Sequence, residues 1–552
     1  MNGIDGATYT DTHIFYEFSF DLRKIEKAKQ IGMVFSKAKK RWYLSRNMMN
    51  ERLFEIQFSK DPVVQVRHHV MLEAAGHYKP NPLLMEHQRR AVELAMNTDR
   101  HLFAYDTGVG KTFIGIEIIK FKAVKTLVVC PLSIITPAWF EDLDKFAPEI
   151  RKANLWKQKR RQLRFYRQEM MKSQVCIVNF EAFKSQLQYI EEGGFKMVLI
   201  DESSKIKNYK SQITKDITKY CDNIEFVYLF SGTPAPNSEL EYFPQTRIIN
   251  PLIHGKSYFR HRNKFFVNPG LGFKWFLSGD RRIEFLDGLS KVMTVVKKED
   301  VLDLPPRTFN KREVILSPKE KKAYKEMATQ LVAEIEDEEI TAYNAAVKIM
   351  KLRQVTAGFM FNEDGVPMFL GTSKLKELLS LLEEIGANQV IIWTQFQYEA
   401  FQIMDALAPH QRMALKRGFK DYEQSLHENP VCGLCNGTVS QDLKDLQVRL
   451  FKEGKFQYMI AHPKSLGHGV TLTNTSYAIY NSLSYSSEEH KQSQDRIYRK
   501  GQYNACTYYY LLAPGTIDPV IYSALRGKTK MENAVLSYIK GAHSAKLKWA
   551  GI

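Results

Sequence analysis

The stretch Tyr105-Asp106-Thr107-Gly108-Val109-Gly110-Lys111-Thr112 decides the fold of this chain. It follows an apolar run, HLFAY (101–105), and opens a helical pattern, TFIGIEIIKF. A glycine-containing loop that ends in Lys-Thr between a strand and a helix is typical of a phosphate-binding loop. The first glycine of the usual pattern, GxxxxGK[ST], is replaced here by Tyr105, so the match rests on GxGKT.

The residues of this loop have distinct expected roles. Gly108 and Gly110 permit a tight wrap, and backbone N–H groups at the helix start face the anion. Lys111 is expected to contact the β- and γ-phosphates of ATP, and Thr112 to bind Mg²⁺. The loop backbone around the nucleotide would also include Thr107 and Val109. A glycine turn without a ligand is the alternative that the loop alone leaves open.

An acidic pair, Asp201-Glu202, closes the apolar run KMVLI (196–200), about ninety residues after the loop. An acid at the carboxyl tip of a parallel strand lies beside the phosphate loop in such sheets. Asp201 is therefore expected to hold Mg²⁺, and Glu202 to orient or deprotonate the attacking water. A helix-capping Asp-Glu-Ser-Ser turn is the structural alternative.

Short apolar runs separated by helical patterns continue along most of the chain. Continuous apolar runs are typical of parallel strands buried on both faces. The first series is HLFAY (101–105), TLVVC (126–130), QVCIV (174–178), KMVLI (196–200) and EFVYLF (225–230); the second is QVIIW (389–393), QYMIA (457–461), YAIYN (477–481) and TYYYLL (507–512). Two successive α/β domains are predicted, with mainly helical protrusions at 240–300 and 315–385.

The first eighty residues differ in pattern and predict a small α+β domain. FYEFSF (15–20) and RWYLS (41–45) favour strands, and DLRKIEKAKQI between them favours a helix. The prolines in KPNPLL (79–84) mark a boundary. The predicted domains are therefore 1–80, 81–300 and 301–552, the last including a C-terminal brace.

Composition narrows the class of protein. The 552 residues carry a net charge of +18, which favours a polyanionic partner, although a solvated basic surface is the alternative. Basic and aromatic residues are mixed in 151–167 and 256–266. No apolar run is long enough to span a bilayer, no signal peptide is visible, and six cysteines form no disulfide framework, so a cytoplasmic location is expected.

From about residue 83 to 540 the sequence resembles the Swi/Snf-type ATPases of helicase superfamily two, in the family's motif order. The resemblance rests on these segments: Glu86-His87-Gln88, CPLSIITPAWFEDLDKF (130–146), Asn179-Phe180-Glu181, Asp201-Glu202-Ser203-Ser204, SGTPAPN (231–237), VVKKEDVLDLPPRT (295–308), LRQVTAGF (352–359), SKLKELLSLLEE (373–384), LGHGVTLT (466–473) and QSQDRIYRKGQ (492–502). It implies two tandem RecA-like lobes and a DNA-dependent ATPase. Ser204 stands where many members have His.

The resemblance also implies roles for individual residues. Gln88 is the expected adenine contact, and Gly469 and Gln492 are expected near the nucleotide. His468 is expected to be a positioning residue. The residues expected to contact DNA or to couple DNA to hydrolysis are Pro131, Ser133, Trp139, Asn179, Ser231, Thr233, Asn237, Thr394, Gly467, His468 and Thr471.

Two arginines in the last motif are expected to be catalytic. Arg496 and Arg499 are three residues apart, so on a helix they would share a face. An arginine supplied by a second domain stabilises charge growing on the γ-phosphate and raises the rate by about 10³–10⁵. Such a site requires closure of the lobes, which would drive movement. Surface arginines paired with Asp495 or Glu489 are the alternative.

Two further segments suggest a DNA-recognition module and a metal site. The segments FEFSFD, KIEKAKQI and KKRWYLS weakly resemble the HARP modules of annealing helicases, which would imply recognition of forked or partly melted DNA. Cys432 and Cys435 form a CxxC that invites a zinc site with His427 or His410. A structural zinc site normally needs four ligands and no second CxxC exists, so zinc is not favoured.

The sequence thus predicts an ATP- and Mg²⁺-dependent translocase on double-stranded DNA that remodels branched DNA by annealing, fork regression or branch migration. Displacement of a DNA-bound protein such as RNA polymerase, strand separation, and a nucleotide-gated scaffold without turnover remain alternatives. A monomer on DNA is expected, with replication, recombination or transcription proteins as candidate partners. The domain composition favours a bacterial or viral protein over a chromatin remodeller.

Overall fold

The chain divides into two compact units, Met1–Leu302 and Asp303–Ile552. This division lies next to the expected boundary at residue 300. The computed structural model describes residues 6–18, 21–31, 33–36, 40–46, 48–58, 78–156, 163–268, 270, 275–336, 342–362, 364–466 and 470–527. Residues 59–77, just before the expected end of the small domain near residue 80, lie outside these ranges. Part of the expected C-terminal brace, from residue 528 on, also lies outside them.

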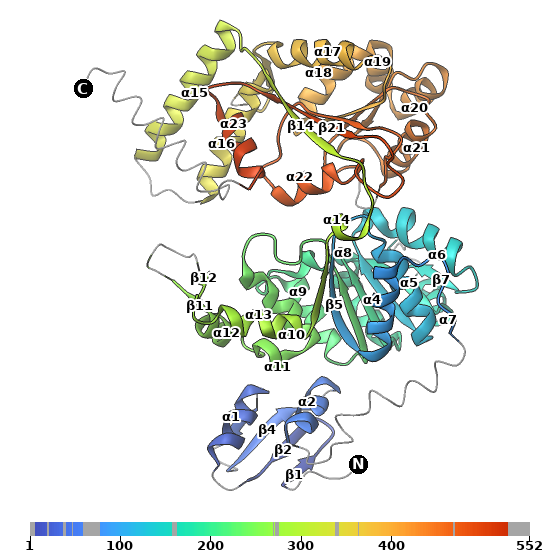
Figure 1. Cartoon of the computed structure of the whole chain (residues 1–552), viewed down its shortest axis with the longest axis vertical. Helices are drawn as coiled ribbons and strands as arrows, with labels where there is room; N and C mark the ends of the chain where they lie inside the picture. Colours follow the sequence, from blue (N-terminus) through green and yellow to red (C-terminus); the bar gives the residue numbers. More distant parts are fainter. Residues whose placement is uncertain are drawn as a thin grey trace. The chain divides into compact units, whose positions relative to one another are not determined.

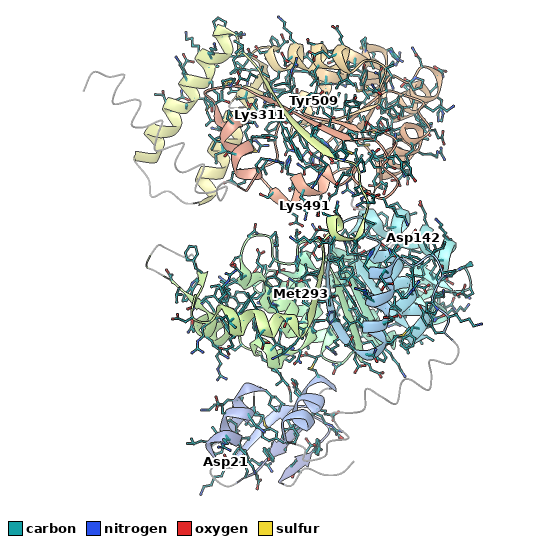
Figure 2. The ribbon with its side chains drawn as sticks, in the orientation of Figure 1. Asp21, Asp142, Met293, Lys311, Lys491 and Tyr509 are labelled. Carbon is teal, nitrogen blue, oxygen red and sulfur yellow. The ribbon has the colours of Figure 1, made fainter. Side chains whose placement is uncertain are left out.

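The amino-terminal part of the first unit forms a four-stranded antiparallel sheet with two helices. The strands are β1 (Ala7–Tyr9), β2 (His13–Tyr16), β3 (Val34–Ser36) and β4 (Arg41–Ser45), in the order β1-β2-β4-β3. The helices are α1 (Leu22–Gln30) and α2 (Met48–Phe58). Asp21 caps α1 by accepting a bond from Arg23 N at 2.8 Å (Figure 2). Ile14, Tyr16 and Leu44 are buried against the helices, and the residues that alternate with them along the strands are mostly half-buried.

A seven-stranded parallel sheet forms the centre of the first lobe. Its order is β13-β5-β10-β9-β6-β8-β7, which places β10 between the strand before the phosphate loop and the strand that ends at Asp201. The strands are β5 (Arg100–Tyr105), β6 (Thr126–Cys130), β7 (Lys152–Asn154), β8 (Val175–Asn179), β9 (Met197–Asp201), β10 (Phe226–Phe230) and β13 (Met293–Val296).

Helices cover both faces of this sheet, which is why its central strands are apolar throughout (Figure 1). Along each strand, alternate residues enter two separate cores. Val128 and Leu199 pack with α4 (Glu86–Asn97), α5 (Lys111–Lys122) and α6 (Glu141–Phe146). Leu127 and Val198 pack with α7 (Leu163–Lys172), α8 (Phe180–Glu192) and α9 (Gln212–Cys221).

A protrusion follows β10 in the first lobe. It contains α10 (Tyr242–Ile249), α11 (Pro251–His254), α12 (Tyr258–Phe265), the hairpin of β11 (Phe266–Val267) and β12 (Phe276–Leu277), and α13 (Arg282–Ser290); α14 (Lys298–Val301) follows β13. His254 and His261 lie in its aromatic core, with ring centroids 5.1 Å apart. The protrusion is mainly helical as predicted, with this added hairpin.

The second unit has a six-stranded parallel sheet in the order β14-β21-β20-β17-β19-β18. Figure 1 shows α17 and α18 on one side of the strands and α22 on the other. The strands are β14 (Arg307–Glu313), β17 (Val390–Trp393), β18 (Cys432–Cys435), β19 (Tyr458–Ala461), β20 (Tyr477–Tyr480) and β21 (Cys506–Leu512).

The helices of the second unit are α15 (Pro318–Glu336), α16 (Ala342–Thr356), α17 (Ser373–Ile385), α18 (Gln397–Leu407), α19 (Pro409–Arg417), α20 (Phe419–Glu428), α21 (Gln441–Lys452), α22 (Ser487–Gln494) and α23 (Ile517–Leu525). A hairpin, β15 (Phe359–Phe361) with β16 (Pro367–Phe369), follows α16. Within the described ranges, every helix is too short or too polar to cross a lipid bilayer.

The predicted fold class is confirmed: each unit holds a parallel sheet flanked by helices, and a small α+β domain precedes them. All nine predicted parallel strands are present, each within one or two residues of its expected bounds. The edge strand β18 coincides with VCGLC (431–435), which the family resemblance places on a strand, whereas three edge strands, β7, β13 and β14, were not predicted. Their side chains are partly exposed, so their sequences lack a continuous apolar run.

Candidate functional site

The phosphate loop connects β5 to α5, with Lys111 as the first residue of the helix. Gly108 and Gly110 have φ values of 85° and 81°, a region that side chains with a Cβ rarely adopt. The Lys111 ammonium group donates to the carbonyl oxygens of Tyr105 at 3.1 Å and Asp106 at 3.2 Å. The loop therefore has its lysine folded across it, at the amino-terminal end of a helix, as a phosphate site needs.

Two side chains of α4 hold the loop from behind. The Gln88 amide and the His87 ring both bond to the carbonyl oxygen of Val109, at 3.0 Å each. The Gln88 Oε1 atom accepts from Met85 N at 2.9 Å. A Cβ on Gly110 would lie 2.2 Å from Gln88 Nε2, so a side chain there would have to displace the Gln88 amide. Gln88 thus positions the loop, and its contact with adenine stays a prediction.

Asp201 and Glu202 lie at the carboxyl end of β9, at the same sheet edge as the loop. Both are buried. Asp201 Oδ1 accepts from Glu202 N at 3.0 Å, and its Oδ2 accepts from Trp139 Nε1 at 3.1 Å. Burial raises the pKa of Asp201 to about 6, the Glu202 carboxylate adds to this, and the Lys111 ammonium opposes it. Such perturbed acids are typical of functional sites.

The motif at 231–237 touches this site from β10. Ser231 N donates to Phe103 O at 3.1 Å. A Cβ on Gly232 would meet Thr107 at 3.4 Å, so the motif packs directly on the phosphate loop. Thr233 N donates to Ser231 Oγ at 3.2 Å, and Asn237 is held by Glu241 at 2.8 Å.

Gln245 connects this motif to the acidic pair and was not anticipated from the sequence. Its Oε1 atom accepts from Ser203 Oγ at 2.7 Å, and its Nε2 atom donates to Pro234 O at 2.7 Å. Gln245 is fully buried in α10. The sequence of this helix, YFPQTRII, gave no signal, because Gln245 stands beside two other polar residues, Thr246 and Arg247.

Several of the residues expected to contact DNA or to couple, Ser231 among them at 0% exposed, are too buried for direct contact with DNA. Trp139 is 0% exposed, Asn179 3% and Thr394 1%. Asn179 caps α8 by accepting from Ala182 N at 3.3 Å. The side chains of Trp139 and Asn179 have partners inside the first lobe, and burial leaves only the coupling role open for all of these residues. Pro131 is buried and Ser133 half-buried, at the start of the turns that follow β6.

The expectation that Arg496 and Arg499 share a helical face is wrong. The helix α22 ends at Gln494, and both arginines lie in the turns that follow. They are nevertheless brought together, because Arg496 donates to Val470 O at 3.4 Å and Arg499 to Thr471 Oγ1 at 3.0 Å. Arg496 is only 2% exposed, and Glu489 pairs with Lys464 at 3.0 Å. Arg496 and Arg499 are therefore not surface arginines paired with Glu489.

The remaining predicted residues of the second lobe are only partly described. Gln492 lies half-buried on α22, and its amide donates to Glu488 at 3.4 Å. Gly467, His468 and Gly469 lie outside the described residues. The same holds for 157–162, the centre of the first basic and aromatic cluster.

The donor set at the nucleotide site fits Mg²⁺ better than a transition metal. A carboxylate, Asp201, and a hydroxyl, Thr112, are hard oxygen ligands, and Mg²⁺ in nucleotide sites takes its other ligands from phosphates and water. Across the described ranges, no three His, Cys, Asp or Glu side chains are grouped to hold a metal by themselves. Cys432 and Cys435 are buried in β18, where residues three apart point to opposite faces.

The amino-terminal domain presents an open face opposite its two helices. Thr8, Phe15, Tyr43 and Val34 lie directly across from one another on β1, β2, β4 and β3. Val34 is 52% exposed, and the rings of Phe15 and Tyr43 are half-buried. The Arg41 guanidinium lies 3.9 Å from the Phe15 ring centroid. Aromatic rings with cations on an open sheet suit stacking of unpaired bases.

Two family models match the chain and show which family it belongs to. The family model described as the SNF2-related domain matches residues 87–358. The model described as the helicase conserved C-terminal domain matches residues 373–501. The chain belongs to the SNF2-related family. The SNF2-related match contains the phosphate loop and the acidic pair, and the helicase match contains both arginines.

Individual relatives are longer than this SNF2-related chain. An uncharacterised ATP-dependent helicase of Mycoplasma genitalium is 24% identical over 79% of this chain and 40% of the relative. The human DNA annealing helicase and endonuclease ZRANB3 is 25% identical over 84% of this chain and 42% of the relative. The chain thus spans less than half the length of these relatives. The SWI2/SNF2 ATPase core of Sulfolobus solfataricus in complex with double-stranded DNA is 20% identical, with a TM-score of 0.38, and the alignment covers 83% of this chain and 95% of that one.

Proposed function

We propose that this SNF2-related protein is an ATP-driven motor that moves along double-stranded DNA and remodels branched DNA. The observation that supports the motor most strongly is the convergence at one sheet edge of Lys111, Asp201 and the 231–237 motif. These are the parts that phosphoryl transfer to water requires: a phosphate cradle, an acid for the metal, and contacts that sense the γ-phosphate.

Each step of ATP hydrolysis would have its own residues. Lys111 would bind the β- and γ-phosphates, and Glu202, held beside Asp201, would orient the attacking water. Thr112 and Asp201 would hold Mg²⁺, which when bound neutralises charge on the phosphate oxygens. Arg496 or Arg499 would supply positive charge to the transferring phosphoryl group when the lobes close.

A net charge of +18 supports a nucleic-acid track. The segment that follows β6, from Pro131 to Phe146, is the part of the first lobe that we assign to the DNA backbone. Closing and opening of two lobes during each ATP cycle would shift this grip along the duplex.

Branched DNA is proposed as the preferred substrate because of the amino-terminal domain. Its open row of Phe15 and Tyr43, with Arg41 beside it, matches the stacking and charge that unpaired bases require. A fork or junction offers such bases next to a duplex, which the motor would hold at the same time. The relative from human is named a DNA annealing helicase, in keeping with this substrate class.

The proposal is tested by the steady-state ATPase rate without nucleic acid and with duplex DNA, single-stranded DNA, forked DNA and RNA. Strong stimulation by duplex DNA, greatest on forks, is expected. Stimulation by single strands or RNA alone would indicate a strand-separating helicase instead. Turnover on none of them would indicate a nucleotide-gated scaffold.

A further inference from the structure

Trp139 connects the proposed DNA-binding segment to the nucleotide site by a direct bond. Its indole N–H donates to Asp201 Oδ2 at 3.1 Å, and the side chain is 0% exposed. Asp201 Oδ1 is already bonded to Glu202 N at 3.0 Å. Both oxygens of this carboxylate therefore have fixed partners, and one of the two comes from a segment outside the phosphate loop and the acidic motif.

The indole is wedged against the helix that carries Lys111. A Cβ built on Gly115, four residues along α5, would lie 2.7 Å from Trp139 Cη2. The ring thus fills the space that a side chain at position 115 would need. Its position depends on α5 on one side and on the acidic strand end on the other.

The backbone that carries Trp139 is a π-helix, Ile135–Phe140, preceded by a 3₁₀ turn, Leu132–Ile134. Glu141 N donates to Thr136 O, five residues earlier, which is the π pattern. Short π segments are rare and occur often at functional sites. Leu132 is 39% exposed on the same turns, whereas Trp139 points inward. One short segment therefore faces solvent at one end and the nucleotide site at the other.

From this geometry we infer that Trp139 is a positioning residue that transmits DNA contact at 131–140 to the orientation of the Asp201 carboxylate. A shift of the segment on DNA moves the indole N–H, and Asp201 Oδ2 moves with it. The carboxylate therefore rotates, because its other oxygen stays bonded to Glu202 N. The inference rests on the proposed function, since it takes this segment to be the DNA contact. Trp139 touches neither DNA nor nucleotide itself.

The test measures coupling rather than activity alone. The affinity for a fluorescent ADP analogue with Mg²⁺ is measured with and without saturating duplex DNA, and the affinity for DNA is measured separately. Coupling between two sites changes affinity by roughly 5–150-fold in typical cases. In Trp139→Phe, which keeps an aromatic ring and removes the N–H, this factor is expected to fall below about 2-fold while DNA affinity is retained.

Two more variants separate this role from simple packing. Gly115→Ala favours the helix but pushes on the indole, and it is expected to lower the coupling factor in the same way. Trp393→Phe is the matched control: Trp393 is 0% exposed in the second unit, and its Nε1 has no hydrogen-bond partner within the described ranges. Its coupling factor is expected to equal that of the wild type.

The outcomes distinguish the inference from the proposed function. If duplex DNA changes nucleotide affinity in the wild type and equally in Trp139→Phe and Gly115→Ala, Trp139 does not transmit DNA contact. Loss of DNA affinity in both variants would equally overturn the inference, because it would place the residue in the DNA grip. If the wild type responds to no DNA, the proposed function fails, and the inference fails with it.

Discussion

Glu202 is held in an unusual backbone conformation at the nucleotide site. Its φ of 58° lies in the left-handed region, and the side chain is buried. Outside glycine this conformation costs about 1–2 kcal/mol per residue, and such strain concentrates at functional sites. The strain supports the assignment of Glu202 to the attacking water, since a purely structural turn would favour glycine or asparagine here.

Glu202→Gln is therefore expected to lower the ATPase rate by about 10²–10⁴, the range for loss of a positioned acid or base. Nucleotide and DNA affinities should change little, because Gln keeps the size of Glu and one of its two acceptor oxygens while losing the charge and the basicity. Steady-state turnover and fluorescent nucleotide binding check both statements. Glu149→Gln, at an exposed position of the same lobe, serves as control. Equal activity in Glu202→Gln would defeat the site assignment.

Gly110 and Gly194 both have positive φ and allow the effects of backbone strain and of side-chain contact to be separated. Gly110→Ala places a Cβ 2.2 Å from Gln88 Nε2, whereas Gly194 has a φ of 66° and no atom within 4 Å of its Cβ. Both substitutions should cost about 1 kcal/mol of stability through backbone strain. Only Gly110→Ala should abolish nucleotide binding, as measured with a fluorescent ATP analogue. Normal binding by Gly110→Ala would show that the loop does not hold phosphates.

At the scale of elements, buried strands were predictable and exposed ones were not. TLVVC matches β6 without error because all five residues are buried between two helical layers. In β14 (RTFNKRE), exposed charged residues interrupt the apolar ones, so no run appears. Arg496 and Arg499 were placed on a helix by spacing alone, but the helix ends at Gln494. The Trp139–Asp201 and Gln245–Ser203 contacts join segments far apart in sequence, and no local pattern predicts them.

The second lobe has a buried ionic network that fixes the loop before α22. Lys374 Nζ lies 2.7 Å from Asp518 Oδ2 and donates to Asn481 O at 3.0 Å. Their side chains are 3% and 5% exposed. Asn481 and Ser482 also bond to the buried Glu399. The network joins α17, α18 and α23 to Asn481 and Ser482, the two residues that follow β20.

Lys374→Met is expected to destabilise the protein by about 3–5 kcal/mol, because it leaves the Asp518 carboxylate buried without its partner. Adding Asp518→Leu should recover part of this loss. Lys291→Met removes an exposed pair, with side chains 60% and 61% exposed, and should cost at most about 1 kcal/mol. Urea unfolding of the wild type, the two single variants and the double variant compares their free energies of unfolding. A loss no larger in Lys374→Met than in Lys291→Met would contradict the account.

For the whole molecule, four of the buried histidines are expected to lower stability in acid. Burial lowers the pKa of His101 and His254 to about 4, and that of His261 and His490 to about 3. The unfolded chain binds these protons below about pH 6.5, whereas the folded chain does not. Stability is therefore complete above pH 6.5 and falls as the pH drops toward the folded values.

At pH 5 each of these histidines should cost about 2 kcal/mol relative to pH 7.5. Thermal unfolding midpoints are expected to drop steeply between these pH values. His261→Phe, inside an aromatic cluster, should reduce the slope, while exposed His427→Phe should not. A pH-independent midpoint from 7.5 to 5 would show that these side chains are not buried as neutral groups.

The open face of the amino-terminal domain makes the choice of substrate testable. Phe15→Ala with Tyr43→Ala should lower the affinity for forked DNA by about 1–3 kcal/mol per lost stack and leave duplex-stimulated hydrolysis unchanged. Phe35→Ala is the control, because Phe35 is 45% exposed but pairs across the sheet with Trp42 on the opposite face. Anisotropy measurements of binding to forked and to duplex DNA test this loss of affinity. Equal fork affinity in the double variant would remove the domain's proposed role.

The most direct test of movement along the duplex is displacement of a third strand from a DNA triplex. The wild-type protein with ATP and Mg²⁺ is expected to release a labelled triplex-forming oligonucleotide without separating the duplex beneath it. Glu202→Gln should bind the same DNA and release nothing. Hydrolysis by the wild type without release of the third strand, or release that needs no ATP, would contradict the translocase.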